Sequence, residues 1–149
     1  MPDVYILRNR LVAFLDVLGF GNMLQSLDVE LLHEKYSQFI DDIKTMTFYQ
    51  AQGDRTGRTN FAHAQIVSDS IILVSNEVDD IYNVNNFIAA VSFLLENGLI
   101  SRLFLRGAIA YGDFLLDVDR QIFLSKALSE AVMSTCSQTT SILQRDSRQ

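Results

Sequence analysis

The sequence predicts a single α+β domain, and three observations lead to this prediction. The chain has 149 residues, a length typical of one domain. Apolar residues make up 48% of it and charged residues 20%, so the chain can bury a core. Short β-branched and aromatic runs alternate with longer stretches whose apolar residues recur at helical spacing. This alternation indicates strands and helices mixed along one chain.

The first half of the chain predicts a strand, a helix and a loop. Residues 11–17 (LVAFLDV) form a short apolar run that stops before Gly19, which is typical of a buried strand. Asp28 suits the N-cap of a helix that continues to about Thr47. Residues 50–60 contain two glycines and no apolar periodicity, so we expect a loop there.

The second half predicts two hairpins and two further helices. Residues 61–67 and 71–74 have strand character and flank the turn Ser68-Asp69-Ser70. An apolar stripe between Ile81 and Leu95 indicates a helix that Asn97-Gly98 closes. The remaining expected elements are strands at 102–111 and 114–117, a turn between them at Gly112-Asp113, and a short helix at 126–133.

The resulting order of elements is strand, helix, strand, strand, helix, strand, with an added hairpin arm. This is the pattern of a ferredoxin-like βαββαβ sheet with helices on one face. We place the domain at residues 1–133. The Ser/Thr/Gln-rich residues 134–149 are expected to form a polar, disordered C-terminal tail.

Charge and cysteine content exclude several classes of function. Twelve basic residues against 18 acidic ones give a net charge of −6, which argues against binding a nucleic-acid backbone. Cys136 is the single cysteine, so no internal disulfide or multi-cysteine zinc site is possible. No run approaches the ~20 apolar residues of a membrane span, and Asp16 interrupts the N-terminal apolar run. We expect a cytoplasmic protein that binds neither nucleic acid nor membrane.

Two carboxylates are expected to meet at one end of this sheet. Right-handed crossovers place the first and third strands side by side and antiparallel. Asp16 lies near the end of the first strand, and Asp69 and Ser70 mark the start of the third. Paired carboxylates at strand ends suit Mg²⁺ or Mn²⁺, which bind oxygen ligands together with substrate phosphates. Each aspartate alone also suits a simpler role, as a turn former or helix cap.

The residues after Asp16 add a possible phosphate contact. The turn from Leu18 to Gly21 leads into a short helix expected at about residues 22–27, whose free backbone N–H groups suit a triphosphate. Arg106 ends an apolar strand and can contact phosphate, or equally pair with an acidic neighbour. Other motifs are weak, because Gly19 and Gly21 lack the third glycine of a dinucleotide turn and His33 and His63 lack zinc-ligand spacing.

Four segments carry a resemblance to a known family. FLDVLGF, IVSDSIIL, RGAIAYG and KALSEA, in this order and spacing, resemble the class III nucleotidyl cyclase catalytic domain over about residues 11–132. The closest likeness is to the bacterial cyclases of antiphage signalling that make cyclic pyrimidine nucleotides (cCMP or cUMP). This resemblance implies a homodimer with composite sites at its interface. It also implies conversion of a nucleoside triphosphate to its 3′,5′-cyclic monophosphate and pyrophosphate.

The resemblance also implies roles for particular residues. Two divalent metal ions per site, Mg²⁺ or Mn²⁺, would be held by Asp16, Asp69 and the backbone carbonyl of Val17. The nucleotide would contact five residues: Leu18, Gly19, Phe20, Gln65 and Arg106. Gln65 stands where the purine cyclases keep a base-reading Lys or Glu, so neither purine preference carries over. The likeness to the cyclic-pyrimidine cyclases implies CTP or UTP as the substrate.

The chain departs from the family pattern in its last helix. The stretch SKALSEAVMST has no Asn or Arg, whereas the purine cyclases place both on this helix. Ser125 stands in place of the family's glycine, and no closing strand follows Val132, so the last strands of the family's domain are not expected. No catalytic side chain is assigned. The alternative function is a catalytically degenerate cyclase-fold module that binds nucleotide or only dimerises.

Overall fold

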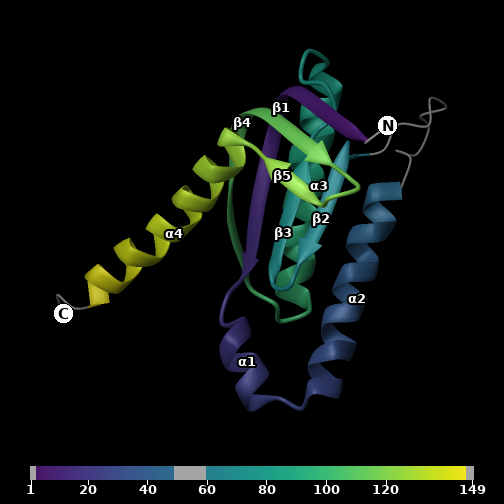
Figure 1. Cartoon of the computed structure of the whole chain (residues 1–149). Helices are drawn as coiled ribbons and strands as arrows, with labels where there is room; N and C mark the ends of the chain where they lie inside the picture. The colour runs from purple at the N-terminus through teal and green to yellow at the C-terminus, as the bar shows by residue number, and fades with distance from the viewer. Residues whose placement is uncertain (1–2, 49–59, 147–149) are drawn as a thin grey trace.

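The structure is a computed structural model that describes residues 3–48 and 60–146. Its central feature is a curled antiparallel sheet of five strands in the order β2-β3-β1-β4-β5 (Figure 1). The elements in chain order are β1 (Val4–Val17), α1 (Phe20–Ser26), α2 (Val29–Phe48), β2 (His63–Val67), β3 (Ser70–Val74), α3 (Ile81–Ile100), β4 (Leu105–Asp117), β5 (Ile122–Leu124) and α4 (Lys126–Asp146). The expected α+β class and ferredoxin-like strand order are confirmed.

Alternation of side chains along β1 divides the core between the two faces of the sheet. On one face, Ala13, Leu15 and Val17 pack with Phe39 of α2 and Phe87 of α3. These two helices cover that face, as the sequence predicts (Figure 1). Because successive strand residues point to opposite faces, Val12 and Phe14 face the other way.

The opposite face has a smaller core of its own. Val12 packs there with Phe114 of β4 and with Ala127 at the start of α4. The sheet curls until β5 crosses in front of β3, and the ring of Phe123 lies 5.8 Å from that of His63 on β2 (Figure 1). Helix α4 begins against this face and then leads away from the sheet (Figure 1). Among the described residues, no helix covers the part of this face around the end of β1 (Figure 1).

The hairpin predicted at residues 102–117 differs from the structure. The expected turn at Gly112-Asp113 is wrong, because β4 runs through these residues and Gly112 pairs with Arg10 of β1. The irregularity lies in β1 instead, where the register shifts between Leu7 and Arg10 and Asn9 has a φ of 53°. Asp113 stabilises this bulge, since its carboxylate accepts hydrogen bonds from the Asn9 backbone N–H (2.9 Å) and the Arg8 guanidinium (3.0 Å). These contacts also explain why β1 begins at Val4 rather than at residue 11.

Two helices are longer than predicted. Gly98 does not close α3, which continues to Ile100. A Cβ at Gly98 would lie 2.6 Å from the Leu103 carbonyl oxygen, so glycine permits a close approach there. Helix α4 does not end at residue 133 but continues to Asp146. The hydroxyls of Thr135 and Ser137 donate to the Ala131 and Ser134 carbonyls, which lets polar residues remain helical. The division of the chain at residue 133 stays a prediction, and the loop expected at residues 50–60 lies outside the described residues apart from Asn60.

Candidate functional site

The ends of β1 and β3 bring Asp16 and Asp69 to the same end of the sheet. Asp16 pairs with Ser70 in the register of the two strands. The Val17 backbone N–H donates to the Asp69 carbonyl at 3.0 Å. Ser68 and Asp69 are the two residues between paired Val67 and Ser70, and Ser68 adopts a φ of 55°, so the tight turn carries Asp69 at its tip. The structure therefore places Asp16 and Asp69 at the same end of the sheet, as the topology predicts.

Asp16 forms an ion pair with Arg106. On the other side of β1, Asp16 pairs in register with Arg106 of β4. The Arg106 Nε and Nη2 groups donate to Asp16 Oδ2 at 3.2 and 3.0 Å. The Asp16 side chain is only 18% exposed and the Arg106 side chain 25%, so the pair is largely shielded from solvent. This contact explains how the apolar run FLDVL tolerates a charge.

Tyr36 of α2 lies near Asp16 and Asp69. Its hydroxyl donates to the Ser68 carbonyl at the hairpin turn, and its ring lies 5.4 Å from that of Phe20. Burial raises the pKa of Tyr36 to about 12, with smaller contributions from the negative charges of Asp69 and Asp16. The phenol thus lies within the field of both carboxylates and stays protonated at neutral pH. In the sequence, Tyr36 belongs to the apolar stripe of its helix, and only its hydroxyl indicates that it needs a polar partner.

The turn after β1 places Leu18, Gly19 and Phe20 beside these carboxylates. The Leu18 N–H donates to the Phe104 carbonyl at 2.7 Å, so that N–H is already paired. Gly19 has a φ of 71°, in the left-handed region that favours glycine, and it is the N-cap of α1. Helix α1 begins at Phe20, slightly earlier than predicted. The first N–H groups of a helix have no partner within the helix, so those of α1 remain candidates for an anion.

Gln65 lies farther from the carboxylates than the other candidates. It pairs with Ile72, which in turn pairs with Phe14 of β1, so Gln65 shares the face of Asp16 at a position one side-chain row away. Two strand spacings, roughly 10 Å, separate β2 from β1. Gln65 can therefore contact only a ligand that extends across the sheet from Asp16.

The other titratable candidates do not join this site. His33 lies on α2 beside Ser37, and His63 packs against Phe114 and Phe123. Cys136 is exposed on α4. Residues 3–48 and 60–146 contain no group of three His, Cys, Asp or Glu side chains that could hold a metal ion. A cation at this end of the sheet would depend on Asp16, Asp69 and backbone oxygens such as that of Val17.

These donors fit a hard divalent cation. All of them are oxygens, which Mg²⁺ and Mn²⁺ prefer, and the two carboxylates with the single Arg106 guanidinium leave a net negative charge. Substrate phosphates commonly supply further oxygen ligands to such ions.

The likeness of this chain to known proteins lies in its fold, which is that of class III nucleotidyl cyclase catalytic domains. The sequence itself matches no protein-family model and no curated protein at significant similarity.

Two solved structures show the likeness. One is the catalytic core of a rhodopsin-guanylyl cyclase with converted specificity, in complex with ATPαS; it matches with a TM-score of 0.61 at 10% identity, over 90% of this chain and 74% of that one. The other is the non-canonical dimeric guanylyl cyclase domain of the RhoGC fusion protein from the aquatic fungus Blastocladiella emersonii. It matches with a TM-score of 0.59 at 11% identity, over 91% of this chain and 77% of that one. At these identities the likeness establishes the fold. The closer likeness to cyclic-pyrimidine cyclases stays a prediction.

Ser125 holds the start of α4. The Ser125 hydroxyl donates to the Asp113 carbonyl at 2.7 Å and accepts from the Leu128 N–H at 3.1 Å. Ser125 therefore caps the helix and ties it to β4.

Within the described ranges, no helix combines the length and apolar character that crossing a membrane requires.

Proposed function

We propose that this chain is a metal-dependent nucleotidyl cyclase that converts CTP or UTP to the 3′,5′-cyclic monophosphate and pyrophosphate. The observation that carries the proposal is the convergence of Asp16 and Asp69 at one end of a cyclase-fold sheet. The sequence resemblance to bacterial cyclic-pyrimidine cyclases suggests antiphage signalling as the setting.

In this proposal Asp16, Asp69 and the Val17 carbonyl hold two Mg²⁺ or Mn²⁺ ions. When bound, such ions neutralise triphosphate charge and acidify the ribose 3′-hydroxyl. The 3′-oxygen then bonds to the α-phosphorus as pyrophosphate leaves, and the hydroxyl proton passes to solvent. The proposal assigns no side chain of the site as a general base. Positioning of the nucleotide and neutralisation of its charge would therefore account for the rate acceleration.

The remaining residues orient the nucleotide. Arg106 lies beside Asp16 and can direct its other N–H groups to the triphosphate. The N–H groups at the start of α1, after Gly19, face the same ligand in this proposal. Gln65 shares the face of Asp16 and can both donate to and accept from a pyrimidine edge. Because that face is partly uncovered, a second copy of the chain would complete the site in a homodimer.

A product assay tests the proposed activity directly. The chain is incubated with Mn²⁺ and ATP, GTP, CTP or UTP in turn, and mass spectrometry identifies any cyclic monophosphate. We expect cCMP or cUMP, lost in Asp16→Ala and Asp69→Ala. Asp79→Ala serves as a matched control, since it removes an exposed carboxylate at the opposite end of the sheet. A cyclic purine product would refute the substrate assignment, and equal activity of all variants would refute the site.

The alternative is a degenerate cyclase-fold module that binds nucleotide or only dimerises. The observation that favours it lies in α4, where the stretch from Ser125 to Thr135 offers neither Asn nor Arg. Mn²⁺ binding measured by calorimetry, with and without nonhydrolysable CTP, separates the possibilities. Metal-dependent nucleotide binding without product would support the module, and light scattering of the same samples would report whether the chain is a dimer.

A further inference from the structure

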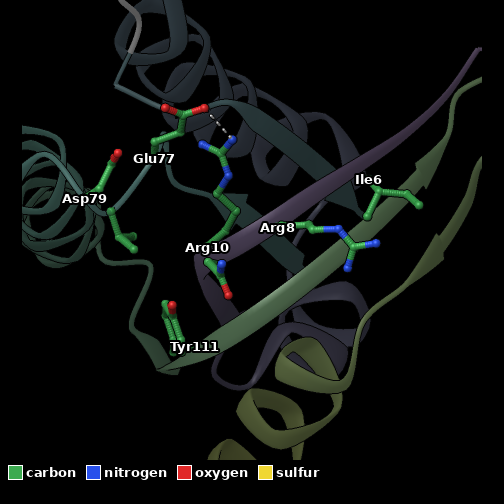
Figure 2. A pocket seen from close by; sticks show the side chains of 8 residues that line it. Ile6, Arg8, Arg10, Glu77, Asp79 and Tyr111 are labelled. Atoms are coloured by element: carbon green, nitrogen blue, oxygen red, sulfur yellow. Dashed lines mark ion pairs between the residues drawn. The ribbon is translucent and has the colours of Figure 1, made fainter.

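A cavity lies near the N-terminal half of β1, away from Asp16 and Asp69. It has a volume of about 610 Å³ and is bounded by β1, β4 and the segment that leads into α3 (Figure 2). Its wall includes Ile6, Arg8, Arg10, Glu77, Asp79 and Tyr111. At roughly 3.3 Å per residue, six strand positions place Arg10 about 20 Å from Asp16. The two sites are therefore separate.

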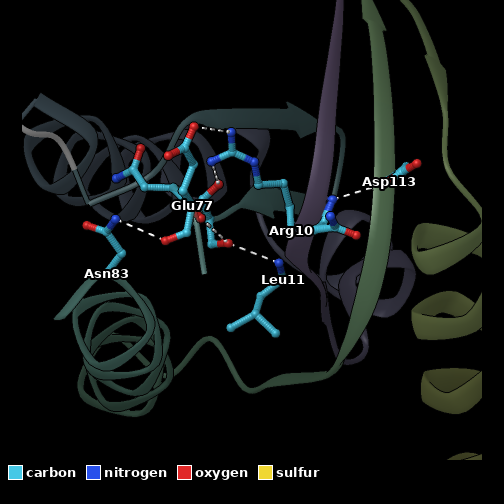
Figure 3. Close-up of polar contacts among 8 residues, drawn as sticks. Arg10, Leu11, Glu77, Asn83 and Asp113 are labelled. Atoms are coloured by element: carbon cyan, nitrogen blue, oxygen red, sulfur yellow. Dashed lines mark hydrogen bonds and ion pairs between the residues drawn. The ribbon is translucent and has the colours of Figure 1, made fainter. Parts of the chain in front are cut away.

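The most unusual group in this cavity is the Arg10 guanidinium. Its side chain is only 12% exposed, and its Nε is buried without a hydrogen-bond partner. Nη1 lies 3.5 Å from the Ser75 carbonyl oxygen, and Nη2 lies 3.6 Å from Glu77 Oε1 (Figure 3). Both distances are at or beyond the long limit for a hydrogen bond. Arg10 is thus a largely buried cation whose donors are poorly satisfied.

Glu77 is a weak partner for this cation. Its side chain is 72% exposed, so water and salt screen its charge. Arg8, the other cation of the cavity, already pairs with Asp113 at 3.0 Å. A largely buried guanidinium with a loose partner gains most from an anion that offers two oxygens in one plane. Carboxylate and phosphate groups have this geometry.

The cavity also offers apolar surface next to Arg10. Ile6 and Tyr111 are 53% and 56% exposed, and both line the same hollow (Figure 2). The volume falls in the range of pockets for small molecules, roughly 300–1,000 Å³. We propose that this cavity binds a small organic anion, a carboxylate or phosphate on an apolar body, with Arg10 holding the oxyanion and Tyr111 contacting the body. This inference does not depend on the proposed cyclase activity.

An NMR titration of the full chain tests this proposal with three probes. Benzoate and phenyl phosphate carry the two oxyanions on the same ring, and benzamide has the shape of benzoate without its charge. At millimolar concentration, we expect benzoate or phenyl phosphate to shift the backbone amides of residues 6–10, 77–79 and 111. Benzamide should leave them unchanged. The anion with the larger effect identifies which oxyanion the site takes.

Two variants should change the affinity for the anion in opposite directions. Glu77→Gln removes the competing carboxylate from an exposed position, so affinity for the anion should rise several-fold. Arg10→Gln should lower it by about tenfold or more, as expected for loss of a charge-assisted contact. Arg120→Gln and Asp16→Asn are controls that should leave the affinity unchanged, the second because Asp16 lies about 20 Å from Arg10. The inference is wrong if neither anion shifts these amides or if Glu77→Gln fails to raise the affinity.

Discussion

Replacing Gly107 with alanine should destabilise the strand pair that holds Arg106 beside Asp16. Gly107 pairs with Leu15 across β1 and β4. An added Cβ would lie 2.2 Å from the Phe14 carbonyl oxygen and 2.5 Å from Leu15 Cδ2. A flexible side chain could move aside, but the carbonyl belongs to the paired backbone of β1. The strands must therefore separate locally, which weakens both the pairing and the Asp16–Arg106 contact.

The size of this effect follows from packing and chain length. Overpacking of this kind costs about 1–3 kcal/mol, and a clash with backbone favours the upper half of that range. For a chain of about 150 residues, 1 kcal/mol lowers the Tm by about 2–4 °C. We expect Gly107→Ala to lower the Tm by roughly 4–12 °C. Circular dichroism during thermal unfolding measures this shift.

Gly21→Ala is the matched control. A Cβ at Gly21 meets nothing within 4 Å, and the residue lies inside α1. Alanine there should raise the unfolding free energy by about 0.5–1 kcal/mol, because glycine loses more entropy in a helix. Opposite shifts for the two variants would support the described packing. An unchanged Tm for Gly107→Ala would refute it.

Three further substitutions test groups around the two faces of the sheet. The pKa of Tyr36 is about 12 in the folded chain and 10.0 in the unfolded chain, so the folded chain keeps the proton longer. The unfolding free energy therefore falls as pH rises from 10 to 12. Tyr36→Phe should remove this part of the decline, measured by urea unfolding. Burial lowers the pKa of His63 below 6.5, so stability falls as pH drops below 6.5, and His63→Phe should flatten this acid limb. Phe114 is fully buried beside His63, and Phe114→Ala should cost about 3–5 kcal/mol in the same assay.

Specific outcomes would contradict these expectations. If Tyr36→Phe shows the same alkaline decline as the unchanged chain, the phenol is not buried near Asp69 and Asp16 as described. A steeper acid limb in His63→Phe would mean that the imidazole gains a favourable charged contact on folding. A loss below about 1 kcal/mol for Phe114→Ala would show that the smaller core repacks around the site.

The strand order and the meeting of Asp16 with Asp69 could be predicted because both depend on periodicity and crossover handedness. The ion pair of Asp16 with Arg106 was one of two alternatives, since a strand-end arginine suits phosphate as well as carboxylate. The bulge at Asn9 could not be predicted, because it depends on Asp113, a residue on another strand that looks like a turn former. The prediction that Gly98 ends its helix was wrong for a similar reason. Glycine is needed there for a close approach to Leu103, which the local sequence does not reveal.

The position of β1 in the sheet has a consequence for synthesis and folding. Strand β1, the first of the described strands, is the central one, and both of its neighbours, β3 and β4, follow much later. Asp16 and Arg106 are 90 positions apart, so their contact cannot form until most of the chain has left the ribosome. Until then the apolar run around Phe14 has an unpaired edge on each side, a condition that favours aggregation. Folding of this domain is therefore expected to be slow and dominated by distant pairings, with the candidate site among the last parts to assemble.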